Sequence, residues 1–486
     1  MMIRYPMDPS KVHLMTVKGS KYALDVNSTV FFEIDDLVYD ILQKMGQVPK
    51  ESRIVEDLAQ NYPRHEIMAS LGELKKLVAQ NQLFSGDRFT RSRPSANAPL
   101  GMICMNIAHV CNLRCTYCFA NREGYTQDHT LMTRETADRA VDFLIRNSRE
   151  RKDLEISFFG GEPLLNLPVI VHTVGYAKEQ ARKHGKVIRF HVTTNGTVLT
   201  PEIISFLKQN NFSIILSLDG PKEVQDSIRR FPNGKGSYDV VVQNLKKLLA
   251  EREAFRHLTI RSTFTHKNID IENLMMHLAS IGCDSISVEP AFISPGNPLD
   301  IQREDMNGLL GHYDILANEY LKEMVNGRYF SFFHIKQMMD HVHRKRPKIT
   351  QCGASVGYVA IGADGKIYPC HKFVGKNEFL IGDVFMGITN KTLQETFESA
   401  HVRNKSKCMA CWARYICGGA CHYLAILYND DIKEPYNLEC EMTKHRIELG
   451  LHLYCSLRSE NPSMHQFLYG NGVQSRNDCG AGRNYP

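Results

Sequence analysis

Residues 102–118 read MICMNIAHVCNLRCTYC. The first half is a short apolar run typical of a buried strand, and Cys111, Cys115 and Cys118 follow directly after it. Three thiolates this close together suit one face of an iron–sulfur cubane. Because a [4Fe–4S] cluster needs four ligands, they leave one iron open to a small molecule. A zinc site with His109 as the fourth ligand is the competing interpretation.

Strand and helix patterns alternate after this stretch. Six βα repeats predict a parallel sheet, either open and doubly wound or curled into a partial (β/α)6 barrel. The motifs below fall at the carboxyl ends of the strands, where barrel enzymes place their chemistry, and this favours the barrel. The predicted strands are Met102–Ile107, Glu155–Phe159, Ile188–Thr193, Ser213–Leu218, Leu258–Phe264 and Ser285–Glu289.

The second predicted strand ends in FFGGEP, residues 158–163. Gly160 and Gly161 lack side chains, so a ligand can approach their backbone groups, and Glu162 can accept a hydrogen bond from an ammonium group. Taken alone, a Gly-Gly turn after a strand is common, so this is a weak signal.

Polar motifs also follow the third and fourth predicted strands. Thr194-Asn195-Gly196 by itself predicts an ordinary turn. Ser217 and Arg229 offer a hydroxyl and a guanidinium group that suit a carboxylate, although a capped helix start with a surface ion pair would look similar.

Together, in this order, the motifs resemble the radical SAM superfamily over roughly residues 102–290. The resemblance implies that CxxxCxxC holds a [4Fe–4S] cluster whose open iron is chelated by S-adenosyl-L-methionine (SAM). Tyr117 would pack by the adenine, the GGEP segment would receive the amino group, and Ser217 and Arg229 would receive the carboxylate. Family members often have His-Asp before this arginine, where this chain has Gln225-Asp226. The implied SAM contacts are Tyr117, Gly160, Gly161, Glu162, Asn195, Ser217 and Arg229.

Seven cysteines crowd into residues 352–440, and their spacing resembles the SPASM domain of radical SAM enzymes. The resemblance implies two auxiliary [4Fe–4S] clusters, and so three clusters in all. A zinc ribbon remains the alternative for the later cysteines. The nearer cluster would have only three ligands and an open iron for substrate. The resemblance assigns Cys352, Cys370 and Cys421 to the nearer cluster, and Cys408, Cys411, Cys417 and Cys440 to the farther one.

The first unit of the chain has its own pattern. Tyr22–Ile34 alternates and turns at Asn27-Ser28, as a β-hairpin does, and three helical patterns follow it. This predicts a winged-helix-like module, and peptide-modifying SPASM enzymes often begin with such a module to recognise a leader peptide by β-augmentation. A merely structural cap on the barrel is the alternative. The predicted units are a recognition module (1–87), a linker (88–100), the radical SAM partial barrel (101–330), a SPASM domain (331–458) and a mobile tail (459–486).

Composition narrows the function classes. The chain has 486 residues, a net charge of +6 and 14 cysteines. It shows no long basic run with aromatics, so nucleic acid is not an expected partner, and the basic stretch 341–348 is expected to be a solvated helix end. We expect no signal peptide and no membrane span, hence a cytoplasmic protein whose clustered cysteines bind metal. Cys104 and Cys283 are expected to be buried small hydrophobes.

The leading functional hypothesis is a radical SAM maturase. It would install thioether cross-links, from cysteine sulfur to carbon, in a leader-bearing precursor peptide or protein subunit, with an electron donor such as flavodoxin or ferredoxin. The resemblance is to maturases of ranthipeptide (SCIFF-type) peptides and of the quinohemoprotein amine dehydrogenase subunit. Carbon–carbon cross-linking, oxidation of Ser or Cys to formylglycine, and a zinc-dependent peptide-binding scaffold are the alternatives. No catalytic base is assigned; Asp219 and Glu289 lie at strand ends, but so do many structural acids.

Overall fold

The computed structural model describes residues 7–48, 50–89, 98–122, 129–291, 293–345 and 347–470. Its main sheet has the order β10-β9-β8-β7-β6-β5-β4-β11-β12-β13-β14, and the strands from β4 to β9 pair in parallel in chain order. These six are β4 (Met102–Ala108), β5 (Asp153–Gly160), β6 (Val187–Thr194), β7 (Ser213–Ser217), β8 (His257–Phe264) and β9 (Ser285–Pro290). The six predicted strands are therefore confirmed, each to within two residues.

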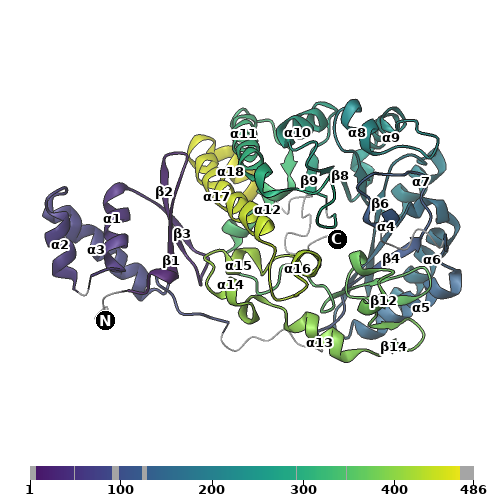
Figure 1. Ribbon diagram of the computed structural model, residues 1–486, viewed down its shortest axis with the longest axis horizontal. Helices are drawn as coiled ribbons and strands as arrows, with labels where there is room; N and C mark the ends of the chain where they lie inside the picture. Colours follow the sequence, from purple (N-terminus) through teal and green to yellow (C-terminus); the bar gives the residue numbers. More distant parts are fainter. Residues whose placement is uncertain are drawn as a thin grey trace.

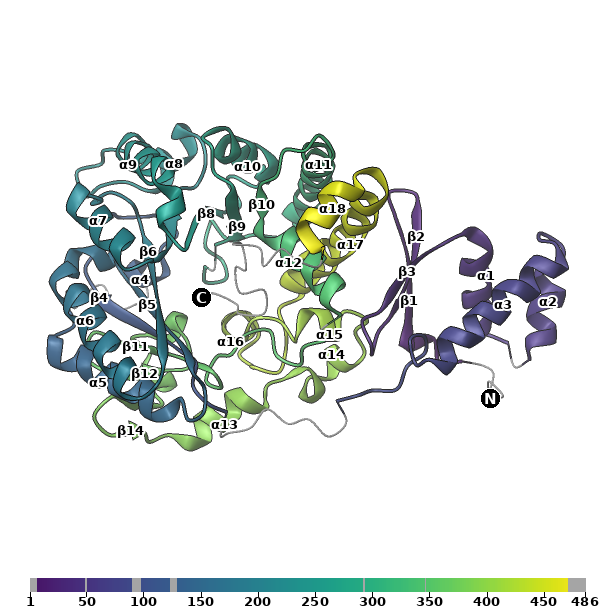
Figure 2. The same cartoon turned by 180° about the vertical axis from the view of Figure 1, so that it is seen from behind.

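Helices follow the strands and cover one face of the sheet (Figures 1 and 2). In the sheet β4 and β9 do not meet, because β5 to β8 lie between them, and the sheet continues past β9 into β10 (Ser331–Phe332). The parallel α/β fold is thus as predicted, while the six-stranded barrel describes only part of a larger open sheet. The covering helices are α5 (Arg134–Asn147), α6 (Leu167–Lys183), α7 (Pro201–Gln209), α8 (Lys222–Ile228), α9 (Tyr238–Ala250), α10 (Ile271–Ser280) and α11 (Met306–Val325).

The cysteine-rich region extends the same sheet. Its strand β11 (Tyr358–Ile361) pairs in parallel with β4, so it is built onto the first barrel strand. The pairing places these cysteines beside the barrel. The remaining elements are β12 (Lys366–Tyr368), β13 (Gly382–Asp383), β14 (Gly387–Ile388), α13 (Lys391–Ser399), α14 (Ser406–Met409), α15 (Arg414–Cys417) and α16 (His422–Asn429).

The N-terminal module has a three-stranded antiparallel sheet followed by three helices. The predicted hairpin is confirmed as β2 and β3, and its turn is tightened by the Asp25 carboxylate, which accepts from the Ser28 amide at 2.8 Å. A further strand, β1, was not predicted. The elements are β1 (Val12–Val17), β2 (Ser20–Asp25), β3 (Phe31–Ile34), α1 (Asp36–Met45), α2 (Glu51–Leu58) and α3 (Arg64–Ala79). Residues 90–97 of the predicted linker lie outside the described residues.

The long helix α17 (Asn437–Glu460) joins the module to the rest, and α12 (Phe333–Arg344) packs against α17. The Tyr22 hydroxyl of β2 lies 3.0 Å from Nδ1 of His452 on α17. The tail predicted to be mobile from residue 459 instead begins with α18 (Pro462–Tyr469), and Tyr469 stacks on His343 with ring centroids 4.6 Å apart. Residues 471–486, which include Cys479, lie outside the described residues. Within the described residues, no helix is long and apolar enough to cross a bilayer.

Candidate functional site

Cys111, Cys115 and Cys118 lie in the loop after β4, close enough to influence one another electrostatically. Burial raises the pKa of the Cys111 thiol to about 11 and that of Cys115 to about 12, and the neighbouring thiols add to both shifts. Metal binding deprotonates thiols and removes this penalty. The donor set therefore fits an iron–sulfur cluster held on three sulfurs.

The GGEP segment packs directly on this cysteine loop. The amide of Gly161 donates to the Ala108 carbonyl and that of Glu162 to the Val110 carbonyl, both at 2.8 Å. A Cβ atom on Gly161 would lie 2.2 Å from the Val110 carbonyl oxygen, and Gly160 has φ +133°. The glycines thus allow the two loops to touch. The amide hydrogen of Gly161 is used within the protein, while a role for the carbonyl groups of the two glycines in SAM binding stays a prediction.

Glu162 is completely buried and ties three segments together. Its carboxylate accepts from the Thr194 hydroxyl at 2.8 Å, the Asn195 amide at 2.7 Å and the Leu164 amide at 3.1 Å. Burial raises its pKa to about 7. Since a carboxylate has about four acceptor positions, three are taken by the protein and the predicted ammonium contact has one left.

Glu162→Gln is expected to lower the free energy of unfolding by about 1–3 kcal/mol, because the new amide group faces backbone and hydroxyl donors. Denaturant unfolding of the cluster-free protein measures this change. Glu202→Gln, on the exposed first turn of α7, is the matched control and should leave stability nearly unchanged. Equal stability of the two variants would contradict an anchoring role for Glu162.

Asn195 lies at the same loop. Its Nδ2 donates to Asn112 Oδ1 at 2.8 Å and lies 3.8 Å from the Cys111 sulfur. Its Oδ1 accepts from the amide and hydroxyl of Thr197 at 3.0 and 2.7 Å. Asn195 therefore connects the end of β6 to the cysteine loop, which is where the SAM contacts were predicted.

Tyr117 and Arg229 meet, and Asp219, which the sequence placed at a strand end without a role, joins them. Arg229 donates to the Tyr117 hydroxyl at 2.6 Å, and this hydroxyl donates to Asp219 at 2.7 Å. Asp219 is fully buried and also accepts from the Thr263 amide at 3.0 Å. Burial raises its pKa, and Arg229 opposes that shift. Asp219 is thus an anchor rather than a base exposed to substrate.

The loop that carries Arg229 is held by Gln225, the position where the family often has His. The Gln225 side chain accepts from the Asp219 amide at 2.8 Å and donates to the Ser237 hydroxyl at 2.9 Å. Ser237 in turn donates to the Arg229 carbonyl at 2.7 Å. Gln225 therefore holds the backbone of Arg229 in place through Ser237. Ser217 is the last residue of β7, at the same end of the sheet.

The seven downstream cysteines fall into two groups by mutual electrostatic influence. The thiol of Cys370 is affected by Cys421 and Cys352, and burial raises its pKa. The second group has four members, in which burial is again the first cause of raised pKa values. That each group holds one auxiliary cluster stays a prediction. The second group consists of Cys408, Cys411, Cys417 and Cys440.

The remaining described cysteines stand apart from these groups. Cys104 and Cys283 are buried, as expected, and so is Cys455. His109, the residue considered as a zinc ligand, accepts from the Ala363 amide at 3.1 Å through Nε2. It ties the cysteine loop to the strand region after β11, so that nitrogen is not directed at a metal.

A half-buried polar network, not foreseen from the sequence, extends from β9. Glu289 Oε1 lies 2.9 Å from His334 Nε2, and His334 Nδ1 lies 2.8 Å from the Arg446 guanidinium. Burial alone would raise the pKa of Glu289, but His334, Arg261 and Arg446 hold it well below its usual range. Lys372 interacts with Glu289 and also with Cys370 and Cys421, so charged groups connect the sheet with the first downstream cysteine group.

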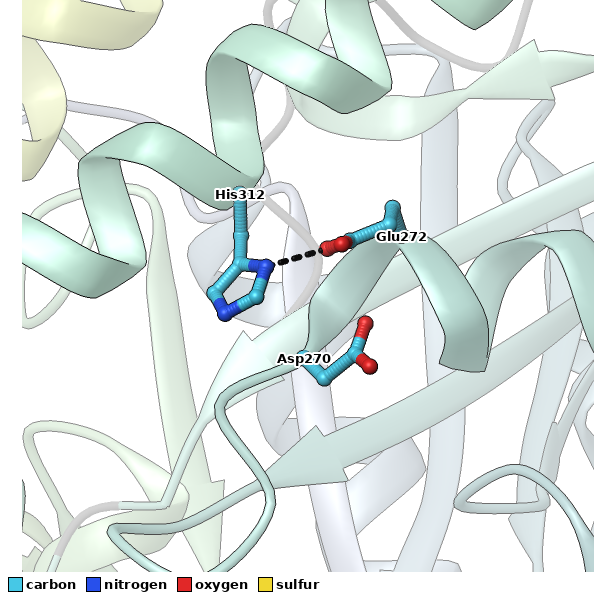
Figure 3. A group of neighbouring side chains, drawn as sticks. All are labelled: Asp270, Glu272 and His312. Atoms are coloured by element: carbon cyan, nitrogen blue, oxygen red, sulfur yellow. Dashed lines mark ion pairs between the residues drawn. The ribbon is translucent and has the colours of Figure 1, made fainter.

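Asp270, Glu272 and His312 are a group of potential ligands for a single metal ion, the one such group among the described residues. Their ligand atoms lie within 4.8 Å of one another (Figure 3). His312 Nδ1 pairs with Glu272 Oε2 at 2.6 Å, and Asp270 caps α10 by accepting from the Asn273 amide at 3.1 Å. These three residues lie where α10 meets α11. The ion pair and the helix cap explain why they are close together without a metal ion.

Residues 105–287 match the family model of the radical SAM superfamily. This match covers the strands β5 to β8 and the loops that carry Cys111, Glu162, Asn195 and Arg229. The chain is a radical SAM enzyme. The enzyme hypothesis is thereby confirmed over the zinc-binding scaffold.

Three curated relatives of this radical SAM enzyme are about a quarter identical to it over the aligned residues. A cysteine-type anaerobic sulfatase-maturating enzyme of Clostridium novyi is 25% identical over 339 residues, which cover 66% of this chain and 87% of the relative. The radical SAM cyclopropyl synthase TigE of Paramaledivibacter caminithermalis is 24% identical over 418 residues, covering 80% and 83%. A serine-type anaerobic sulfatase-maturating enzyme of Bacteroides thetaiotaomicron is 24% identical over 354 residues, covering 66% and 82%.

Solved structures show the same fold. The anSMEcpe enzyme with bound AdoMet and Kp18Cys peptide superposes with a TM-score of 0.62 at 19% identity, covering 75% of this chain and 99% of that one. SuiB of Streptococcus suis superposes with a TM-score of 0.50 at 16% identity, covering 88% and 98%. The likeness therefore extends well beyond the residues of the family model.

Proposed function

We propose that this radical SAM enzyme is a cytoplasmic maturase that installs thioether cross-links in a ribosomally made peptide or protein subunit. The observation that carries the proposal is the group Cys352, Cys370 and Cys421, which has three thiols where the second group has four. A cluster held there has one iron without a protein ligand, and such an iron can take a substrate thiolate.

The residues of the first site have defined tasks in this proposal. Cys111, Cys115 and Cys118 would hold the SAM-binding [4Fe–4S] cluster, which supplies a 5′-deoxyadenosyl radical when SAM is bound and an electron donor such as flavodoxin or ferredoxin reduces it. Arg229, fixed by Tyr117 and Asp219, presents a guanidinium group for the methionine carboxylate. Ser217, Glu162 and the Gly160–Gly161 backbone complete the proposed SAM contacts.

Further residues would hold the peptide. Lys372 connects the first downstream cysteine group with Glu289 and Arg261, so charged side chains border the space next to the proposed auxiliary cluster. β3 is an edge strand of its three-stranded sheet. A leader peptide could add a further strand along its outer edge. Relatives whose names or structures involve peptides, among them the anSMEcpe complex with a peptide, support a peptide substrate.

The cross-link is tested by mass spectrometry of a cysteine-rich, leader-bearing peptide after reaction with SAM and reductant. A thioether product keeps its sulfur, loses two hydrogen atoms per link and resists alkylation by iodoacetamide. One hydrogen leaves with 5′-deoxyadenosine, and one proton and one electron leave separately. A product of unchanged mass, or one with its cysteine thiol intact, would overturn the proposal.

Oxidation of Cys or Ser to formylglycine is the second candidate, favoured by the two sulfatase-maturating relatives. The same experiment separates it, because formylglycine reacts with a hydrazide probe and, when formed from cysteine, has lost its sulfur. A hydrazide-reactive product would assign that function.

A further inference from the structure

The carboxyl-terminal half of α12 separates two cavities. The first, of about 280 Å³, is lined by Phe31, Phe32 and Glu33 of β3, by His343 and Lys345, and by Arg458 of α17. The second, of about 420 Å³, is lined by Gln337, His341 and Arg344 of the same helix and reaches Cys352. Neighbouring residues of one helical turn thus border both cavities, and α12 lies between β3 and β9 in both views (Figures 1 and 2).

The first cavity adjoins the edge strand of the N-terminal module. In that sheet β3 pairs with β2, and its other edge carries the residues that line the cavity. A peptide strand added to β3 would therefore lie at this cavity, with its continuation directed past the end of α12.

The second cavity leads to the sheet. Gly101, Met102 and Glu155 line it, so it opens at the amino-terminal ends of β4 and β5, opposite the end that carries Cys111. Glu155 lies 3.6 Å from His191, and His191 lines a third cavity across β6 to β9 together with Arg261. The buried pair Glu155–His191 therefore borders the second cavity on one side and the third on the other.

Cationic side chains predominate along the first two cavities. Of the acidic residues there, Asp340 is paired with Lys336, and Glu155 faces His191. The basic stretch 341–348 includes the end of α12, where His343, Arg344 and Lys345 are exposed as expected. It also contributes His341, Arg344 and Lys348 to the second cavity. The cationic lining residues are Arg151, Arg344 and Lys348 in the second cavity and Lys345 and Arg458 in the first; the acidic ones are Glu155, Asp340 and Glu33.

We propose that the substrate peptide follows this route. It would run from the outer edge of β3 around the carboxyl end of α12 to Cys352, reaching the barrel from the amino-terminal side of its strands. The segment next to the paired strand would be acidic, because the excess of Arg and Lys along the route favours carboxylates. The inference deepens the proposed function and rests on its peptide substrate.

A fluorescein-labelled peptide that alternates Glu with Ser and Gly is the probe, with the same peptide carrying Gln in place of Glu for comparison. Both are titrated at low salt into the full chain with its clusters, and anisotropy reports binding. The Glu probe should bind about tenfold or more tightly than the Gln probe, and Arg344→Glu/Lys345→Glu should remove that preference. Lys246→Glu, an equally exposed charge reversal on α9, should keep it.

Hydrogen exchange locates the probe, which should protect the backbone amides of residues 337–345. Iron content and far-UV circular dichroism verify that the double variant is folded. Equal binding of the two probes, or unchanged preference in the double variant, would overturn the proposed route. The outcome is separate from the proposed function, since a missing thioether in the product of wild-type enzyme would overturn that function without altering probe binding.

Discussion

Replacing Cys115 by alanine is expected to abolish cleavage of SAM to 5′-deoxyadenosine. The residue lies between the other two cysteines in the sequence of its loop. Burial raises the pKa of its half-buried thiol to about 12, Arg229 opposes that shift, and metal binding removes the remaining penalty. The variant lacks a complete ligand set for the cluster that generates the radical. The rate of SAM cleavage should therefore fall by more than about 10³-fold, which is what the loss of one transition-state hydrogen-bond donor costs in other enzymes. Chromatography of anaerobic reactions with dithionite measures the loss.

Cys104→Ala is the matched control for this experiment. Cys104 is buried in β4, where Tyr358 and Ser157 are its hydrogen-bond partners, and it belongs to none of the three cysteine groups. Its variant should retain most of the activity. If Cys115→Ala cleaved SAM as fast as Cys104→Ala, the loop would not hold the radical source.

Arg229→Met is expected to damage stability and SAM binding together, and a second substitution separates the two effects. The change leaves the Asp219 carboxylate fully buried without its cation, which costs about 3–5 kcal/mol of folding free energy. In Arg229→Met/Asp219→Asn the buried charge is gone, so stability should return. SAM affinity should stay about 10- to 100-fold below that of the wild type, since the lost guanidinium contact is charge-assisted.

Denaturant unfolding and equilibrium dialysis of SAM measure the two quantities. Arg230→Met changes the neighbouring exposed arginine and should affect neither. Recovery of SAM affinity in the double variant would show that Arg229 acts only by neutralising Asp219, and would contradict its proposed contact with the SAM carboxylate.

The sequence predicted the barrel strands well because buried parallel strands are continuous apolar runs with glycine or polar residues after them. The positions of the cysteine loop and the GGEP segment followed from these strands, because both motifs come directly after a predicted strand. What could not be predicted depends on partners far away in the chain. Asp219 is understood only beside Tyr117, and Glu289 only beside His334 and Arg446.

Two differences at the chain ends have similar causes. The strand β1 is short and pairs with β2, so its conformation depends on a neighbour rather than on its own pattern. The tail was predicted to be mobile because its composition is polar, yet Tyr469 packs on His343 of α12 and fixes α18. The electrostatic grouping of the downstream cysteines agrees with the resemblance; spacing alone does not say which cysteines meet.

We expect the three groups of cysteines to hold three separate clusters, one of which is the source of the radical. The measurement that decides this is iron and acid-labile sulfide per chain after anaerobic reconstitution. We expect about twelve irons for the wild type and about eight after alanine replaces the cysteines of any one group. About four irons in the wild type, or zinc in place of iron in the downstream groups, would contradict it.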